Sequence, residues 1–408
     1  MSCPRVFLAI DNCFAAKRWT RPLEWARIVQ ALGIAHVEAS ADNECDPLYC
    51  DPAYLTDWID DVKDAYERTG VKVANLYSGH STYSFLGLSS PDRRNQGRIQ
   101  DQWLKPMIRN ASQLQAGVGF CCHSFSDETL QNSASYAAAE DAVYTRLGEL
   151  ASFAAHCGVE SIGVEQMYAP HMIPWTIQGA RRLLREVCAR TKSHIYLTID
   201  VGHQSGQRKF LRPPYLRLKE TLLQMRATGK PARGLWLGPK SAYGILQEAA
   251  ETPIAQEDYH LNRLEREMDG HAPLFATPED GDPYIWLGQL ACYSPIIHLQ
   301  QTDGSSSPHL PFTEANNQRG IILADKVLRS ISAAYSQAPD SSMPPKCEKV
   351  YLTLEIFPKP TDFPLDILSE LEESVAYWRA YVPKDGLKIE ELVPKHEVDR
   401  EQSLPSDR

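Results

Sequence analysis

The chain contains eight short apolar segments that are rich in β-branched residues. Most of them lack the alternation of polar and apolar residues that marks a strand with one wet face, which indicates parallel strands buried on both faces. We predict strands at residues 5–11, 34–40, 71–77, 117–124, 160–166, 194–200, 294–300 and 349–357.

Helical patterns fill the intervals between these segments. Three of them, PLEWARIVQALG, TDWIDDVKDAYERTG and AEDAVYTRLGELASFAAHCG, end on Gly33, Gly70 and Gly158, and glycine commonly caps the C-terminus of a helix. Repetition of strand, helix and glycine indicates right-handed βα units, and eight such units close a (β/α)8 barrel, the TIM barrel. We therefore predict an α/β fold with one barrel over residues 1–383.

Two regions depart from this rhythm. Residues 204–293 separate the sixth and seventh predicted strands by far more than one helix requires, and they include patterned segments such as EDYHLNRLEREMDG. We expect a helical insert there, which either covers the barrel mouth, forms a subunit contact in a homo-oligomer or is a solvated elaboration. Residues 384–408 are polar, charged and poor in large apolar residues, so we expect a mobile tail.

Four of the predicted strands end in side chains that bind metals: Glu165 in IGVEQ, Asp200 in LTIDVGH, His298 in IIHLQQ and Glu355 in LTLEIF. A single glutamate at a strand end is more often a salt-bridged structural residue, so we base the prediction on all four residues together. At the carboxyl end of a parallel barrel they face one shared mouth, where such barrels carry out chemistry. Three carboxylates and an imidazole would repel one another there unless a divalent cation lay among them. We predict one divalent ion held by these four residues, and the donors suit Mn²⁺, Co²⁺, Mg²⁺ or Zn²⁺.

Further residues are candidates for contacts with a substrate. His203 follows the aspartate of DVGH by three residues, and Gly202 between them lets the chain turn back toward the mouth. A structural role in a loop or in packing is the alternative for each candidate. The other candidates end or follow predicted strands and are His80, His123, His309 and Glu38.

Composition limits the partners and the compartment. The formal net charge of −10 repels polyanions, which argues against nucleic acid and anionic membranes as partners. No apolar run is long enough to span a bilayer, and the N-terminus lacks the pattern of a signal peptide. The ten cysteines form no CxxC pair. We expect a cytoplasmic protein with reduced thiols that acts on a small molecule.

The motifs resemble those of the xylose-isomerase-like barrel superfamily, which includes sugar isomerases, ketose 3-epimerases and endonuclease IV-type DNA repair enzymes. The resemblance covers roughly residues 5–382 and rests on SPDRRNQGRI, VEQ, IDVGH, IHLQQTDG and LEIF. It implies that the four strand-end residues hold one divalent metal and that His203 contacts substrate. The run HLQQTDG is similar to a branch linked to four-carbon ketose phosphates. The chain departs from the family pattern at Gln301, where an aspartate is common, and in its long insert.

These features predict a metal-dependent isomerase or epimerase of a sugar or sugar phosphate. A cation bound to a carbonyl and a neighbouring hydroxyl stabilises the enediolate that forms on deprotonation. We predict that Glu165 and Glu355 exchange the proton, one removing it and the other returning one. A lyase, dehydratase or decarboxylase acting on a keto acid sugar derivative is an alternative, because a bound cation would stabilise its enolate in the same way. An endonuclease IV-type zinc phosphodiesterase would need a carboxylate where Ser307 stands, and a non-catalytic binding barrel is a further alternative.

Overall fold

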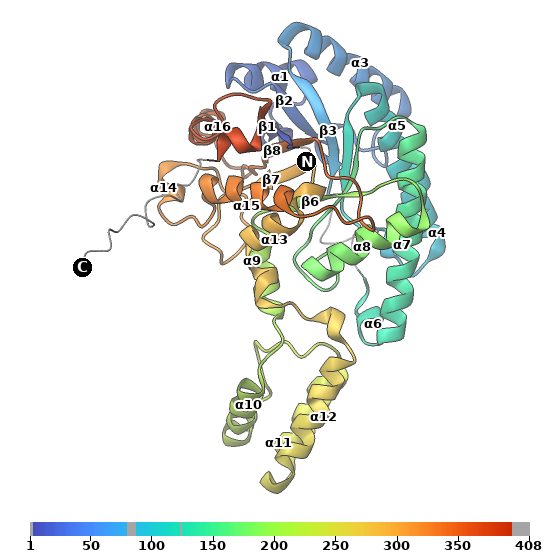
Figure 1. The fold of residues 1–408 in the computed structure, drawn as a ribbon, viewed down its shortest axis with the longest axis vertical. Helices are drawn as coiled ribbons and strands as arrows, with labels where there is room; N and C mark the ends of the chain where they lie inside the picture. Colours follow the sequence, from blue (N-terminus) through green and yellow to red (C-terminus); the bar gives the residue numbers. More distant parts are fainter. Residues whose placement is uncertain (1–2, 80–86, 123–124, 394–408) are drawn as a thin grey trace, which may run out of the picture.

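The computed structural model describes residues 3–79, 87–122 and 125–393. Eight parallel strands follow one another around a closed barrel, because β1 pairs with both β2 and β8 (Figure 1). The predicted (β/α)8 barrel is confirmed. The barrel strands are β1 (Arg5–Asp11), β2 (His36–Ser40), β3 (Lys72–Ser78), β4 (Gly117–Phe120), β5 (Ile162–Glu165), β6 (Tyr196–Asp200), β7 (Ile296–Leu299) and β8 (Lys349–Leu354).

Helices surround the barrel and connect successive strands (Figure 1). Those before the insert are α1 (Pro22–Ala31), α2 (Ala41–Glu44), α3 (Pro52–Thr69), α4 (Arg93–Ile99), α5 (Lys105–Leu114), α6 (Asp127–Leu130), α7 (Ser133–His156) and α8 (Ile177–Arg190). The insert contains α9 (Gln204–Gln207), α10 (Tyr215–Thr228), α11 (Lys240–Glu251), α12 (Glu257–Asp269) and α13 (Pro283–Leu290). The helices after it are α14 (Glu314–Asn317), α15 (Ala324–Ser336), α16 (Pro364–Arg379) and α17 (Ile389–Leu392).

Local sequence signals explain where the covering helices begin and end. In α3 the side chain of Asp51 accepts a hydrogen bond from the Ala53 N–H at the N-terminus, and Gly70 closes the C-terminus with a φ of 74°. Trp58 and Val62 on its inner face are buried and join the same apolar cluster as the barrel strands. The strands are therefore covered on both faces, as their uninterrupted apolar sequence predicts.

The predicted insert between β6 and β7 is helical. Within it, α10, α11 and α12 pack on one another and project away from the barrel (Figure 1). Arg226 of α10 links the three helices, because its guanidinium donates to Glu257 of α12 at 2.6 Å and to the backbone oxygen of Ala249 in α11 at 2.8 Å. The projecting helices thus have internal packing of their own.

The chain continues to pack on the barrel beyond residue 383, where we expected the tail to begin. Leu387–Lys388 forms a short strand, β9, that pairs antiparallel with β1 at Arg5 and Val6. Ile389 at the start of α17 is buried. The sparse apolar residues in this polar stretch are enough to fix it against the barrel, so the predicted boundary at 384 is too early. Residues 394–408 lie outside the described part of the chain.

Two further expectations concern cysteines and membranes. All ten cysteines lie among the described residues, and each is a free thiol. None of the helices in the described ranges is long and apolar enough to cross a lipid bilayer.

Candidate active site

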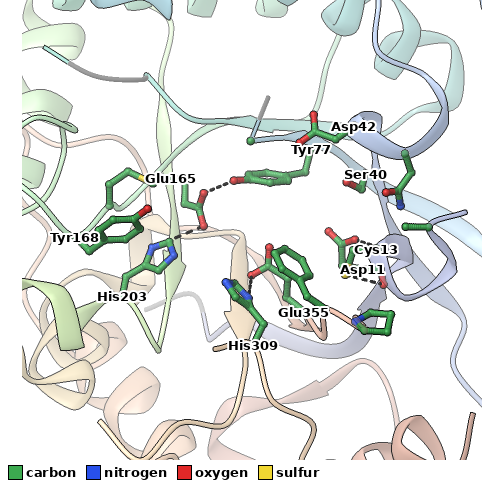
Figure 2. A pocket seen from close by; sticks show the side chains of 16 residues that line it. Asp11, Cys13, Ser40, Asp42, Tyr77, Glu165, Tyr168, His203, His309 and Glu355 are labelled. Atoms are coloured by element: carbon green, nitrogen blue, oxygen red, sulfur yellow. Dashed lines mark hydrogen bonds and ion pairs between the residues drawn. The ribbon is translucent and has the colours of Figure 1, made fainter. Parts of the chain in front are cut away.

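A cavity of about 390 Å³ opens at the carboxyl ends of the barrel strands. Parallel pairing brings the ends of neighbouring strands to one level, so that Asp11 lies beside Glu38 and Asp200 beside His298. None of the described residues that line the cavity belongs to the insert at 204–293. Side chains that reach the cavity from the strand ends and the loops after them include Asp11, Ser40, Tyr77, Glu165, His203, His309 and Glu355 (Figure 2).

The four residues predicted to bind a metal converge at this end of the barrel. Glu165, Asp200, His298 and Glu355 each offer one ligand atom, and these atoms lie within 4.8 Å of one another. All four side chains are buried, with exposed fractions of 0–3%. Burial strengthens the mutual repulsion of the carboxylates, because little water screens them.

His298 is oriented by a carboxylate from β2. Its Nε2 lies 2.8 Å from Oε2 of Glu38, while Asn75 donates to Oε1 of the same carboxylate at 2.6 Å. This network places a proton on Nε2, and Nδ1 then faces Glu165 at 3.3 Å and Glu355 at 3.2 Å. Burial alone would lower the pKa of His298, but Glu355 and Glu38 raise it well above its ordinary value. A cation bound at Nδ1 would therefore displace a proton.

Two donors from neighbouring segments hold the Oε2 atom of Glu165. The hydroxyl of Tyr77 donates to it, and so does the thiol of Cys121 at 3.1 Å. Oε1 therefore faces Nδ1 of His298 at 3.3 Å. Burial alone would raise the pKa of Glu165, but the hydrogen bond from His298 and the charge of His203 lower it. Glu165 is thus an ionised carboxylate whose Oε2 is held by two donors and whose Oε1 faces His298.

Glu355, which directly follows β8, carries an oxygen without a hydrogen bond. Its Oε2 is buried and lies 3.2 Å from Nδ1 of His298 and 3.2 Å from Nδ1 of His309, but neither contact has hydrogen-bond geometry. Burial would raise the pKa of Glu355, but the two histidines lower it well below the ordinary value. A buried, ionised oxygen without a donor is costly unless another positive group completes its surroundings.

Asp200 at the end of β6 is clamped by an amide. Its Oδ1 accepts from the Gly202 N–H at 2.6 Å and from the Gln300 side-chain amide at 2.9 Å, and the same amide lies 2.8 Å from Oδ2. Burial and the charge of Glu355 raise the pKa of Asp200. Gln300 was not among the predicted site residues, although it lies two residues after His298 and directly follows β7.

Asp200 also belongs to a second group of possible metal ligands, with His203 and His309. His203 points its Nδ1 at a backbone oxygen 2.7 Å away, which leaves Nε2 facing Oδ2 of Asp200 at 3.8 Å. The ring of His309 stacks on Phe357 with a centroid separation of 4.1 Å. Burial would lower the pKa of His309, but nearby carboxylates, chiefly Glu355, raise it to about 9. Both histidines line the cavity, where contact with a substrate was predicted.

Asp11 is a cavity residue that the sequence analysis missed. It ends β1, lines the cavity and accepts a hydrogen bond from the Cys13 N–H at 2.6 Å (Figure 2). Burial, together with the charges of Glu38 and Glu355, raises the pKa of Asp11 well above its ordinary value. A carboxyl group that keeps its proton can donate a hydrogen bond. Its position at the end of RVFLAID matches that of the other strand-end acids and was the available signal.

Other predicted residues lie elsewhere. Glu38, a candidate for substrate contact, lies behind His298, and His298 and Asn75 engage its two oxygens. Gln301, at the family's aspartate position, turns its side chain away to bond Asn317 and the backbone of residues 302 and 322. His80 and His123 lie outside the described residues.

The four-donor group fits a divalent cation. It combines three carboxylates with one imidazole, contains no thiolate, and includes the buried Oε2 of Glu355 that makes no hydrogen bond. A histidine whose far nitrogen donates to a carboxylate, as His298 donates to Glu38, is a common arrangement for a metal ligand. The four residues therefore supply ligands for such an ion, and Glu38 supplies the carboxylate that orients the histidine ligand.

Comparison with known proteins gives a family and a fold. A model of the xylose isomerase-like TIM barrel family matches residues 26–225. D-Erythrulose 1-phosphate 3-epimerase of Brucella abortus is 32% identical over 108 residues, which make up 26% of this chain and 31% of that protein. The matching segment thus spans about a third of that curated relative.

Two solved structures share the fold over nearly the whole chain. A protein of Rhodospirillum rubrum, provisionally described as a xylose isomerase, is 20% identical with a TM-score of 0.65, and the match covers 92% of this chain and 99% of that one. The IOLI protein, solved with a zinc atom, is 13% identical with a TM-score of 0.51, and the match covers 92% of this chain and 99% of that one. Identities this low establish the common barrel and nothing finer.

Proposed function

Because the chain belongs to the xylose isomerase-like TIM barrel superfamily, we propose that it is a divalent-metal-dependent isomerase or epimerase of a small sugar. The observation that carries this proposal is the convergence of Glu165, Asp200, His298 and Glu355 within 4.8 Å beside the cavity. In the proposal these four residues hold one divalent ion. When bound, such an ion supplies electrophilic stabilisation of the charge that develops on a substrate carbonyl.

Glu165 and Glu355 are proposed to move the proton. Both line the cavity and reach it from β5 and from the end of β8, which are not neighbouring strands (Figure 2). One glutamate removes the proton from the carbon next to the carbonyl, and the other returns a proton. Positioned acid–base groups of this kind contribute about 10²–10⁴-fold to a rate.

Other cavity residues are proposed to bind and orient the sugar. His203 has its Nδ1 engaged by a backbone oxygen at 2.7 Å, so Nε2 is the nitrogen that can bind a substrate hydroxyl. The surroundings of Asp11 raise its pKa, and we propose that it donates a hydrogen bond from the β1 side when it carries a proton. His309 lies against Glu355 and Phe357, where it can both contact substrate and hold Glu355 ionised.

The named relatives support this chemistry. The Brucella abortus relative is an epimerase of a four-carbon ketose phosphate, and the Rhodospirillum rubrum protein is described as an isomerase of a pentose. Epimerisation at the carbon next to a ketone begins by removing the proton on that carbon, which is the step proposed here for the two glutamates. The zinc atom in the IOLI protein supports a divalent ion in a barrel of this shape.

A second candidate is a multinuclear zinc phosphodiesterase. The observation in its favour is the group formed by Asp200, His203 and His309, which shares Asp200 with the first group. Against it, the chain carries a net charge of −10, and Ser307 stands where this alternative needs a carboxylate. Metal analysis of the purified protein separates the two: one ion per chain supports the isomerase or epimerase, and three support the phosphodiesterase.

The proposed activity is tested by solvent exchange. A panel of 2-ketoses with four to six carbons, together with their phosphates, is incubated with the Mn²⁺-loaded protein in D₂O and followed by NMR. We expect deuterium at a carbon next to the carbonyl in both recovered substrate and isomer. EDTA should stop the exchange, and Mn²⁺ or Co²⁺ should restore it. Release of water or carbon dioxide would instead support a lyase, and no exchange with any ketose would refute the proposal.

A further inference from the structure

We propose that Gln300 is a positioning residue, whose single amide group fixes both Asp200 and the loop after β7 that carries His309. The role rests on the proposed function, in which Asp200 binds the metal ion and His309 contacts the sugar. Gln300 directly follows β7 and is buried. It does not line the cavity, so it would act through these two neighbours.

The amide nitrogen of Gln300 faces the carboxylate of Asp200. Its Nε2 lies 2.9 Å from Oδ1 and 2.8 Å from Oδ2 of that residue, and 2.8 Å from the hydroxyl oxygen of Ser307 in the loop after β7. The Gly202 N–H donates to Oδ1 of Asp200 at 2.6 Å. An amide that contacts both oxygens of a carboxylate restricts its rotation, so Gln300 limits the directions in which Asp200 can bind a cation.

The amide oxygen of the same side chain holds the backbone of His309. Oε1 of Gln300 accepts a hydrogen bond from the His309 N–H at 2.7 Å. The two ends of the amide cannot be exchanged, because an exchange would point its oxygen at the Asp200 carboxylate and its NH₂ group at the His309 N–H. The partners at the two ends therefore define one orientation of Gln300, and Gln300 in turn sets the distance between its partners.

His309 depends on such contacts because its backbone lies in the left-handed region. Its φ is 51°, a conformation that favours glycine and is disfavoured for a residue with a Cβ atom. Such a residue persists where the surrounding structure fixes it, which is common at functional sites. Beside the bond to Gln300, the Gln301 N–H donates to the backbone oxygen of Leu310 at 2.8 Å. Together these contacts keep the ring of His309 stacked on Phe357 at the cavity.

Gly202 leaves the space that the amide of Gln300 occupies. A Cβ atom at residue 202 would lie 2.7 Å from both Nε2 and Oε1 of Gln300, which is closer than such atoms approach. Gly202 is not one of the glycines with positive φ, so close packing and not backbone conformation requires glycine at this position. The segment after β6 is therefore shaped to accept Gln300 against Asp200.

The test replaces the amide by a side chain of similar length that makes no hydrogen bonds. We expect Gln300→Met to bind Mn²⁺ about 10–100-fold more weakly, measured by competition with a fluorescent chelator, because Asp200 is no longer held. At saturating Mn²⁺, kcat/KM for solvent exchange should remain about tenfold lower than in the unaltered protein, because His309 is no longer fixed at the cavity. Adding His309→Ala to Gln300→Met should lower kcat/KM little further, since both changes remove the same contact with the sugar.

Gln301→Met is the matched control. Gln301 is also buried, and its amide nitrogen donates to Asn317 at 2.8 Å and to the backbone oxygen of Ile322 at 3.1 Å, away from Asp200 and His309. Circular dichroism and urea titration should show a similar loss of stability in the two variants, whereas Mn²⁺ affinity and kcat/KM should fall only in Gln300→Met. Equal losses of Mn²⁺ affinity in both variants would show that Gln300 acts only through general stability and would overturn the inference.

Two further measurements keep the role of Gln300 testable on its own. Gly202→Ala retains every polar group but displaces the amide, so it should also weaken Mn²⁺ binding, and normal Mn²⁺ affinity in this variant would count against the role. In crystals of Gln300→Met, we expect a rotated Asp200 carboxylate and a His309 ring no longer stacked on Phe357. Unchanged positions of both would overturn the inference while the isomerase or epimerase proposal stands. Absence of exchange with any ketose in the unaltered protein would instead refute the proposed function.

Discussion

Replacement of Glu38 by glutamine tests how the barrel prepares His298 for a metal ion. Glu38 touches neither the cavity nor the proposed ion, yet its Oε2 lies 2.8 Å from Nε2 of His298 and its Oε1 accepts from Asn75 at 2.6 Å. Glutamine has the same shape but offers one acceptor in place of two. If its amide nitrogen faces His298, the imidazole must carry its proton on Nδ1, the atom that faces Glu165 and Glu355. If the amide nitrogen of the glutamine faces Asn75 instead, two NH₂ donors point at each other with no acceptor between them.

The expected loss follows from either arrangement. A hydrogen bond to a charged group contributes about 1.5–3 kcal/mol, and removal of a carboxylate behind a metal-bound histidine typically costs 10–100-fold in affinity or activity. The second range equals about 1.4–2.8 kcal/mol, so the two agree. We therefore expect Glu38→Gln to weaken binding of Mn²⁺ or Zn²⁺ by about 10–100-fold while the barrel remains folded.

The assay is competition for the metal against a fluorescent chelator, with circular dichroism to confirm folding. Glu44→Gln is the matched control, since Glu44 is also a buried glutamate that accepts two side-chain hydrogen bonds, from Asn12 at 2.9 Å and Trp25 at 2.8 Å, but has no contact with His298. Its metal affinity should match that of the unaltered protein. Unchanged affinity in Glu38→Gln would refute the role assigned to this carboxylate.

Three further predictions concern the two proton-transfer glutamates, the tyrosine that donates to Glu165, and the buried Glu44. Glu165→Gln and Glu355→Gln should each slow solvent exchange by about 10²–10⁴-fold with the fold intact; normal rates in either would remove that residue from proton transfer. Tyr77→Phe removes a donor to Glu165 and should lower kcat/KM about tenfold or more without loss of metal, measured by elemental analysis. Burial raises the pKa of Glu44 to about 7, so the folded protein holds this proton more tightly than the unfolded chain. The stability gained from this tighter proton binding is fully present below about pH 4.5 and is lost as pH rises to 7. We expect the free energy of unfolding to fall by about 3 kcal/mol over this range, and urea titrations of Glu44→Gln should lack this fall.

The barrel could be predicted because its signals are local and repeat eight times. Each strand is a short apolar run, and three of the predicted helices end close to a glycine with positive φ, at Gly33, Gly70 and Gly158. The C-terminal boundary was wrong because β9 and α17 depend on few apolar residues, among them Leu387 and Ile389. Composition averaged over a polar stretch hides a short segment that packs on the barrel.

The convergence of the four metal-type donors could be predicted because the carboxyl ends of all strands in a parallel barrel meet at one mouth. Residues that act by contacting those donors show no comparable pattern in the sequence. Tyr77, Cys121 and Gln300 come next to Glu165 and Asp200 only when β3 to β7 pair side by side. Asp11 also ends a strand, but one more aspartate at such a position is not distinctive in a sequence. The structure distinguishes it by its burial and by the acids around it.

Anomalous diffraction from crystals soaked in Mn²⁺ can show whether the four strand-end donors hold a metal ion. We expect one strong peak per chain at the barrel mouth, bounded by carboxylate oxygens of Glu165, Asp200 and Glu355 and by Nδ1 of His298. The same four side chains should contact it in every copy of the chain. An empty space between them, or manganese bound only elsewhere, would contradict the account.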